Sequence, residues 1–275
     1  MQHQTILVLG GTGKTGSRVA QRLTAMGKSV RIGSRKAIPA FDWENAATWD
    51  AALEGIQSVY VTFQPDLAVP GGKEAISKFT SIAIKNGVQK LVLLSGRGEK
   101  EAQECEEIVI NSGADFTIVR CDWFNQNFSE SFFLDPILAG YVALPRAETL
   151  IPFVDADDIA DVVVAALTEK KHFNKIYELT GPRLITFREV VQEIARITGR
   201  EIVFESIALD DYLNTLRKYQ VPEDQIWLVN YLFTESLDGR NSSITHDIER
   251  ALLRKAKDIS AYIRETSATG VWNVN

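Results

Sequence analysis

Short apolar runs alternate with amphipathic stretches along the first two thirds of the chain. Apolar runs of this length are typical of buried strands, and apolar positions that recur every three or four residues are typical of helices packed on one face. Strands are predicted near residues 5–10, 29–34, 57–63, 90–95 and 115–120, with helices at 14–26, 45–54, 72–86 and 100–112. This order predicts an α/β fold, a doubly wound parallel sheet of the Rossmann type.

The alternation loosens after Asp122, where aromatic and proline-containing segments begin. An apolar helix is then predicted to run to about residue 168, with Asp157 or Asp158 as its N-cap. A strand at 175–179, a helix at 186–198, a strand at 201–207 and several helices to about 265 are predicted to follow. We expect the later elements to form a smaller C-terminal α/β lobe that shapes a ligand cleft.

A glycine-rich loop, Gly-Gly-Thr-Gly-Lys-Thr-Gly at residues 10–16, joins the first predicted strand to the first predicted helix. Glycines let the backbone turn sharply and approach phosphates, while free N–H groups at the helix start supply donors and positive partial charge. The loop matches G-x-G-x-x-G from Gly11 and G-x-x-G-x-x-G from Gly10. It predicts that NAD(P) is bound through its pyrophosphate by Gly10, Thr12, Gly13, Lys14, Thr15 and Gly16.

The loop has two other interpretations. A Walker A loop would need a glycine where the chain has Val8, so Gly13-Lys14-Thr15 is a coincidence. A purely structural turn stays open, because glycine serves strand-to-helix turns with positive φ whether or not a ligand is bound.

The second predicted strand ends in Ser34, Arg35 and Lys36, where an NAD-specific site carries an acidic residue on the ribose 2′-hydroxyl. A guanidinium beside a hydroxyl suits a 2′-phosphate, so NADP(H) is predicted in preference to NAD(H). The alternative is that Arg35 and Lys36 are solvated charges at a strand end. The remaining predicted cofactor contacts are Asp42 and Trp43 at the adenine, with Phe63, Gln64, Ser95, Gly96 and Arg97 at the cofactor's middle.

Candidate catalytic chemistry is defined partly by what the sequence lacks. Ser95 stands where a short-chain reductase has its serine, but no Tyr-x-x-x-Lys occurs in the chain, so the usual phenolate proton relay cannot be built. Trp123, Phe124 and Asn125 follow the fifth predicted strand and suit a flat ligand. Together with Ser95 they are candidates for positioning substrate and nicotinamide. Packing of Trp123 and Phe124 between lobes is the alternative, and no catalytic residue is assigned.

Composition narrows the classes of partner. The 275 residues carry a net charge of −6 and a sequence pI of about 5.3, which leaves no broad basic field for nucleic acid or anionic lipid. Cys105 and Cys121 give no metal-ligand spacing, and Cys121 is expected to be a buried small residue. No signal peptide or membrane span is predicted, and a cytoplasmic location is expected. Glu104, Glu106 and Glu107 are predicted to form a solvated helix face.

These motifs resemble the NmrA-like branch of the atypical short-chain dehydrogenases/reductases. The matching stretches are the glycine loop, Arg35, Ser95, Glu106 to Arg120, Trp123 to Asn127, Asp155 to Ala160, and Tyr177 to Pro182. Phe41-Asp42-Trp43 followed by Thr48-Trp49 looks most like festuclavine- and agroclavine-type reductases and their bacterial relatives. The resemblance implies NADPH-dependent reduction of an iminium or similar carbon, or of a quinone. Both reactions need hydride delivery but little general acid. Other members of the NmrA-like branch are redox-sensing regulators.

We therefore expect an NADPH-dependent oxidoreductase that reduces a small quinone, iminium or enone-like substrate. The alternative is a non-catalytic NADP(H)-binding redox sensor that acts through protein partners. The dinucleotide-binding domain is predicted to comprise residues 1–127 and about 151–175, and the smaller substrate-binding lobe about 128–150 and 176–275. The oligomeric state is left open between monomer and homodimer.

Overall fold

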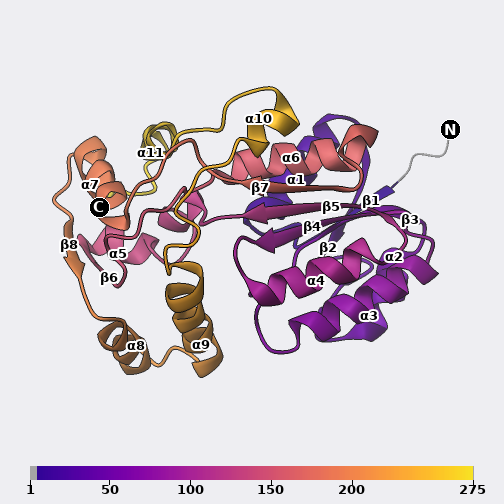
Figure 1. Cartoon of the computed structure of the whole chain (residues 1–275), viewed down its shortest axis with the longest axis horizontal. Helices are drawn as coiled ribbons and strands as arrows, with labels where there is room; N and C mark the ends of the chain where they lie inside the picture. The colour runs from indigo at the N-terminus through magenta and orange to yellow at the C-terminus, as the bar shows by residue number, and fades with distance from the viewer. Residues whose placement is uncertain (1–4, 275) are drawn as a thin grey trace. The chain divides into compact units, whose positions relative to one another are not determined.

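Six parallel strands form the central sheet of the protein (Figure 1). The computed structural model describes residues 5–274. The strands are β1 (Thr5–Leu9), β2 (Ser29–Gly33), β3 (Ile56–Val61), β4 (Lys90–Gly96), β5 (Asp115–Cys121) and β7 (Lys175–Leu179). Their spatial order is β2-β1-β3-β4-β5-β7. From β1 the chain adds β2 on one side and β3 and the later strands on the other, as in a doubly wound sheet. The predicted fold class is confirmed.

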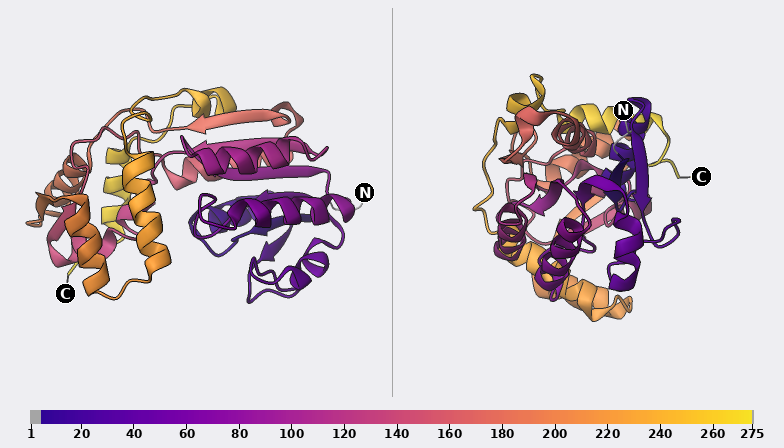
Figure 2. Two further views of the ribbon diagram at one scale, coloured as in Figure 1. Left: turned by 60° about the horizontal axis from the view of Figure 1, so that its bottom comes forward. Right: turned by 90° about the vertical axis from the view of Figure 1, so that its right-hand side faces the viewer.

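Helices cover both faces of this sheet because its strands are apolar on both sides. The helices are α1 (Lys14–Ala25), α2 (Trp49–Leu53), α3 (Gly72–Lys85), α4 (Lys100–Ile110), α6 (Ala156–Thr168) and α10 (Asp247–Leu252). Pairs α1–α6 and α3–α4 pack on opposite faces (Figure 2). Among residues 5–274, no helix is long and apolar enough to cross a membrane.

Helix α6 begins at Ala156, two or three residues before the start that an N-cap at Asp157 or Asp158 would give. Asp157 and Asp158 therefore lie in its first turn, and the prediction that one of them is the N-cap is wrong. Both carboxylates form ion pairs instead of capping the helix: Asp157 with Arg22 at 2.7 Å and Asp158 with Arg254 at 2.6 Å. Negative charge is also favourable in the first turn, where it faces the positive end of the helix dipole.

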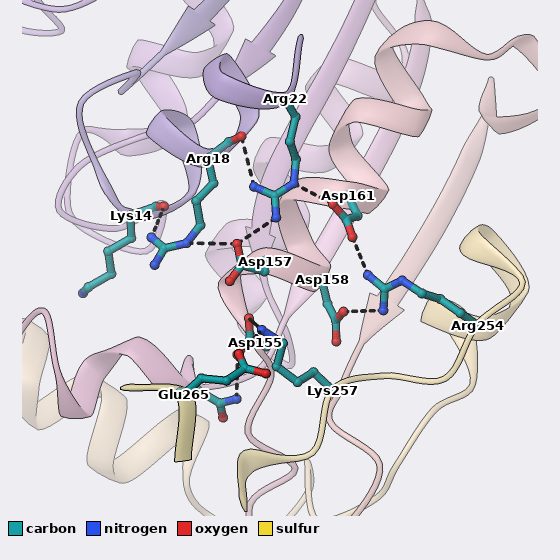
Figure 3. Close-up of polar contacts among 11 residues, drawn as sticks. Lys14, Arg18, Arg22, Asp155, Asp157, Asp158, Asp161, Arg254, Lys257 and Glu265 are labelled. Carbon is teal, nitrogen blue, oxygen red and sulfur yellow. Dashed lines mark hydrogen bonds and ion pairs between the residues drawn. The ribbon is translucent and has the colours of Figure 1, made fainter. Parts of the chain in front are cut away.

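The ion pairs of α6 join three segments that are far apart in the sequence (Figure 3). Arg22 of α1 bridges Asp157 and Asp161, with its Nε 2.6 Å from the Asp161 carboxylate. Arg254 pairs with Asp158 and Asp161 from the opposite side. The glycine-loop helix and the late segment 247–254 are thus both fixed to α6.

The chain divides into two compact units, each with its own core. Unit 1 comprises the sheet and helices above, from residues 5–121, 156–179 and 247–254. Unit 2 comprises residues 122–155, 180–246 and 255–274. Its elements are the parallel pair β6 (Tyr141–Leu144) and β8 (Val203–Ser206), with α5 (Leu134–Ala139), α7 (Phe187–Thr198), α8 (Leu209–Lys218), α9 (Glu223–Tyr231) and α11 (Ile259–Ala268).

Aromatic side chains dominate the core of unit 2. Phe128, Phe153 and Phe187 are fully buried and lie within 6.3 Å of one another, measured between ring centroids. Trp272, near the end of the chain, is 0% exposed, and its Nε1 donates to the Phe128 carbonyl at 2.9 Å. Trp272 is therefore part of this core.

Replacing Trp272 by alanine should lower the free energy of unfolding by about 3–5 kcal/mol, since a large buried ring and a buried hydrogen bond are lost together. Trp227→Ala is the matched control: that indole is 41% exposed, so its removal should cost about 1 kcal/mol or less. Urea unfolding followed by circular dichroism compares the two variants. Equal losses would show that the C-terminal segment does not contribute to the core.

Candidate functional site

The glycine loop lies at the carboxyl end of β1 and leads into α1. Gly10 has φ +60°, and its N–H donates to the Gly33 carbonyl at 3.1 Å. A β-carbon on Gly10 would lie 2.4 Å from Thr62 Oγ1, and one on Gly16 would lie 2.2 Å from the Gly10 carbonyl oxygen. Gly10 and Gly16 are therefore required by the packing of the chain itself.

Gly13 is the least crowded glycine of the loop, although a β-carbon there would still meet a backbone oxygen closely. A β-carbon there would lie 3.3 Å from the Gly10 carbonyl oxygen and 3.5 Å from Gln64 Nε2. Gly13 is also the N-cap of α1, and no side chain forms a cap hydrogen bond there. The first turn carries no acidic residue. The helix start thus presents N–H donors and positive partial charge without a side-chain cap, which fits a pyrophosphate.

The side chains of the loop point in different directions. Thr15 is buried, and its Oγ1 accepts a hydrogen bond of 3.0 Å from the Tyr60 hydroxyl on β3. Burial raises the pKa of Tyr60, which keeps the phenol protonated as the donor. Thr12 is exposed, and Lys14 is half-buried. Thr15 could therefore contact a phosphate only through its backbone N–H. Thr12 could also use its side chain, which is exposed.

The basic end of β2 is open to solvent. Arg35 and Lys36 are exposed, and neither forms an ion pair with any residue from 5 to 274. Ser34 is half-buried, and its carbonyl accepts from the backbone N–H groups of Ala37 and Phe41. These two hydrogen bonds hold Ser34 in the turn that follows β2. The assignment of Ser34 and Arg35 to a 2′-phosphate stays a prediction.

Trp43 and Asp42, predicted at the adenine, belong to an aromatic cluster beside the loop. The Trp43 Nε1 donates to the Thr62 carbonyl at 3.0 Å, and its ring packs against Phe63 at 5.0 Å. The Asp42 carbonyl accepts from Trp49 Nε1 at 2.7 Å. The structure thus brings Trp43, Phe63 and the carboxyl end of β3 together, and Gln64 lies next to Gly13.

Ser95, at the carboxyl end of β4, faces a buried carboxylate. Its hydroxyl donates to Glu106 Oε1 at 2.6 Å, and Glu106 is only 1% exposed. The prediction that Glu106 lies on a solvated helix face is therefore wrong. Glu107 is exposed, and Glu104 is partly exposed and pairs with Lys73 at 2.9 Å. Helix α4 turns Glu106 inward because its partner, Arg120, reaches it from β5.

Arg120 completes a network that spans three strand ends. Its guanidinium contacts both oxygens of Glu106 at 2.6–3.0 Å and Glu178 of β7 at 2.9 Å. Arg97, predicted as a cofactor contact, is buried and lies 3.5 Å from Glu178. The hydrogen bond to Glu106 is the main cause that raises the pKa of Arg120. Sequence reasoning missed Glu178, although its place at the end of a strand was the available signal.

Gly96 shows a second close approach at this strand end. A β-carbon there would lie 2.2 Å from the Glu99 carboxylate. Unlike Gly10 and Gly16, Gly96 meets only the end of a flexible side chain, which could move to admit a β-carbon.

The segment Trp123–Asn125 begins unit 2. Trp123 packs in the aromatic core, 5.4 Å from Phe187 and 5.6 Å from Phe233. Phe124 is half-buried and forms an isolated bridge with Val154. Asn125 is 0% exposed; its Nδ2 lies 3.3 Å from Asp155, whereas its Oδ1 has no hydrogen-bond partner in residues 5–274. A buried acceptor of this kind is costly unless a ligand or water donates to it.

Two further predictions concern cysteines and metal ions. Cys121 is buried, as predicted, and Cys105 is buried too, which raises the pKa of its thiol to about 12. Neither thiol therefore has the character of a nucleophile. Within the part of the chain that the structure describes, no three His, Cys, Asp or Glu side chains gather as metal ligands.

The chain is similar to known NAD(P)H-binding proteins. A model of the NAD(P)H-binding family matches residues 10–170. Agroclavine dehydrogenase of Claviceps fusiformis is 30% identical over 80% of this chain and 83% of its own length. Prestalk A differentiation protein A of Dictyostelium discoideum is 26% identical over 95% of this chain and 92% of its own.

Solved structures show the same fold. The triphenylmethane reductase of Citrobacter sp., determined in complex with NADP(H), superposes with a TM-score of 0.77 at 17% identity. The match covers 95% of this chain and 99% of that one. With the family match and the similarity to agroclavine dehydrogenase, this chain belongs to the NAD(P)H-binding family.

Proposed function

We propose that this protein is an NADPH-dependent reductase of a small organic electrophile. The observation that carries the proposal is the start of α1, where the N-cap Gly13 has no side chain and no side chain caps the N–H groups that a pyrophosphate needs. The coarser part, an NAD(P)H-dependent oxidoreductase of this family, follows from the family itself. The preference for NADPH and the substrate class are our proposal.

The preference for NADPH is supported by the charge at the end of β2. Arg35 is exposed and makes no ion pair in the described chain, so its guanidinium is available to a 2′-phosphate. No carboxylate lies among residues 33–41 to repel that phosphate. The bound NADP(H) of the triphenylmethane reductase is consistent with this choice.

The substrate class is inferred from the missing proton relay. The cofactor supplies a hydride, and a cationic C=N carbon that accepts it becomes a neutral amine without needing a proton. A quinone that accepts a hydride becomes a stabilised phenolate-type anion, which solvent water can protonate. Both substrates suit a chain without Tyr-x-x-x-Lys. We assign substrate positioning to unit 2, where Asn125 offers its buried acceptor and Trp123 an aromatic edge.

The direct test follows NADPH absorbance in purified protein with panels of quinones and cyclic iminium compounds. We expect substrate-dependent oxidation of NADPH with members of at least one panel. Simple ketones should react at least about a hundredfold more slowly, since their alkoxide products need a proton donor. Tight NADPH binding with no turnover on either panel would contradict the reductase proposal.

Arg35→Ala should weaken NADPH binding about ten- to a hundredfold, because one charge-assisted contact contributes about 1.5–3 kcal/mol. NADH serves as the internal control, since it lacks the 2′-phosphate and its affinity should not change. Isothermal titration calorimetry with both cofactors gives the comparison. Equal affinities of the wild-type protein for NADPH and NADH would remove Arg35 from the site.

Two glycine variants distinguish a glycine that ligand binding requires from one that the fold requires. Gly16→Ala should destabilise the protein by about 1–3 kcal/mol, because its new methyl group meets the Gly10 carbonyl. Gly13→Ala should leave the unfolding midpoint near that of the wild type but weaken NADPH binding about tenfold or more. Denaturation and calorimetry measure the two effects. If Gly13→Ala binds NADPH normally, the loop is a structural turn.

A second candidate function is a dinucleotide-dependent regulator that performs no chemistry. The absent Tyr-x-x-x-Lys motivates it, and so does the similarity to a protein named for cell differentiation. In that case NADPH and NADP⁺ should differ in how they affect binding to a protein partner. Sustained turnover in the substrate panels would exclude it.

A further inference from the structure

The hydroxyl proton of Ser95 is already used inside unit 1. The Ser95 Oγ lies 2.6 Å from Glu106 Oε1, a distance typical of a hydroxyl that donates to a carboxylate. Glu106 accepts from Arg120 at both of its oxygens, so its carboxylate acts there as an acceptor only. A serine hydroxyl has one proton and two lone pairs. Ser95 therefore keeps acceptor capacity but has no proton to offer a ligand.

We propose that Glu106 is a positioning residue that fixes Ser95 as a hydrogen-bond acceptor for the nicotinamide half of the cofactor. This inference rests on the proposed function. The cofactor groups that fit are donors, namely the carboxamide NH₂ and the ribose hydroxyls. Ser95 lies at the carboxyl end of β4, the edge of a doubly wound sheet where ligands bind. It is 4% exposed, which suits a single contact with a ligand.

The assignment reverses the role expected from position alone. In a reductase with the complete serine–tyrosine–lysine set, the serine at this place would donate to the reacting carbonyl oxygen. Here such a donation would require the Ser95 proton to leave a buried, arginine-paired carboxylate, and Glu106 would lose a charge-assisted bond. A substrate carbonyl therefore gains nothing from Ser95.

The surrounding ion pairs keep Glu106 in place. Arg120 is held from the other side by Glu178, which also lies 3.5 Å from Arg97. The two arginines and two glutamates balance in charge. Ser95 and Arg120 are direct neighbours in the pairing of β4 with β5, so the carboxylate meets both side chains at one level of the sheet. If the Ser95 hydroxyl rotated away from Glu106, the buried hydrogen bond between them would be lost.

The test compares Ser95→Ala, Glu106→Gln and the double variant, with Glu107→Gln as the control. Glu107 is the next residue on α4 and is exposed, so the same chemical change there should alter nothing. A glutamine at 106 still accepts from Arg120 through its carbonyl, while its NH₂ donates to Ser95 and reverses the hydroxyl. NADPH dissociation constants come from fluorescence titration, and kcat and KM from turnover with a quinone.

We expect Ser95→Ala and Glu106→Gln each to weaken NADPH binding about 2- to 10-fold, the effect of one hydrogen bond. The double variant should be no weaker than the worse single variant, because Glu106 acts through Ser95. In Ser95→Ala the quinone kcat at saturating NADPH should fall by no larger a factor than the NADPH affinity does.

Two results would overturn the inference. One is unchanged NADPH affinity in Ser95→Ala together with a loss of kcat of about a hundredfold, which would identify Ser95 as a donor to substrate. The other is additive losses in the double variant, which would make the role of Glu106 structural. Should Glu106→Gln fail to fold, Ser95→Ala alone decides between acceptor and donor. A wild-type protein that binds neither dinucleotide would instead refute the proposed function.

Discussion

The contact between the Gly10 carbonyl and the α-carbon of Gly16 determines how α1 meets the sheet. No side chain fits there: a β-carbon on Gly16 would approach the carbonyl oxygen to 2.2 Å. Because α1 starts so close to β1, its first N–H groups lie directly above the strand end. The ion pairs of Arg22 with Asp157 and Asp161 hold the same helix from its other end. A loosened glycine contact would therefore shift the N-terminal end of α1, where we propose that the pyrophosphate binds.

This contact also explains why a glycine motif alone is ambiguous. Gly10 and Gly16 are each required by the protein itself, so their presence would be expected with or without a ligand. Gly13 is the least crowded glycine of the loop, since a β-carbon there would lie 3.3 Å from the nearest atom. Gly13 is thus the most informative position for a test of ligand binding, and the sequence cannot distinguish it from the other glycines.

The strands and helices of unit 1 could be predicted because their signals are local. Apolar runs and the glycine stops after α1, α3 and α4 depend on residues within one element. The burial of Glu106 could not be predicted in the same way. Its neighbours Glu104 and Glu107 carry the same side chain but are partly exposed and exposed, respectively. Its burial depends on Arg120, which comes from another strand. The start of α6 was also predicted wrongly because the partners of its acidic residues come from other segments. Asp157 pairs with Arg22 of α1, and Asp158 pairs with Arg254.

The candidate site shows how a missing residue changes the meaning of those that remain. Without a tyrosine–lysine pair, Ser95 has no partner that could return a proton to it, and its own proton is held by Glu106. In the proposed reductase, the carboxyl end of β4 contributes fixed dipoles and shape in place of acid catalysis. Such a site favours electrophiles whose reduced product is stable without an immediate proton. The substrate contacts that we propose belong to unit 2, where Trp123 lies in an aromatic core and Asn125 keeps one unsatisfied oxygen.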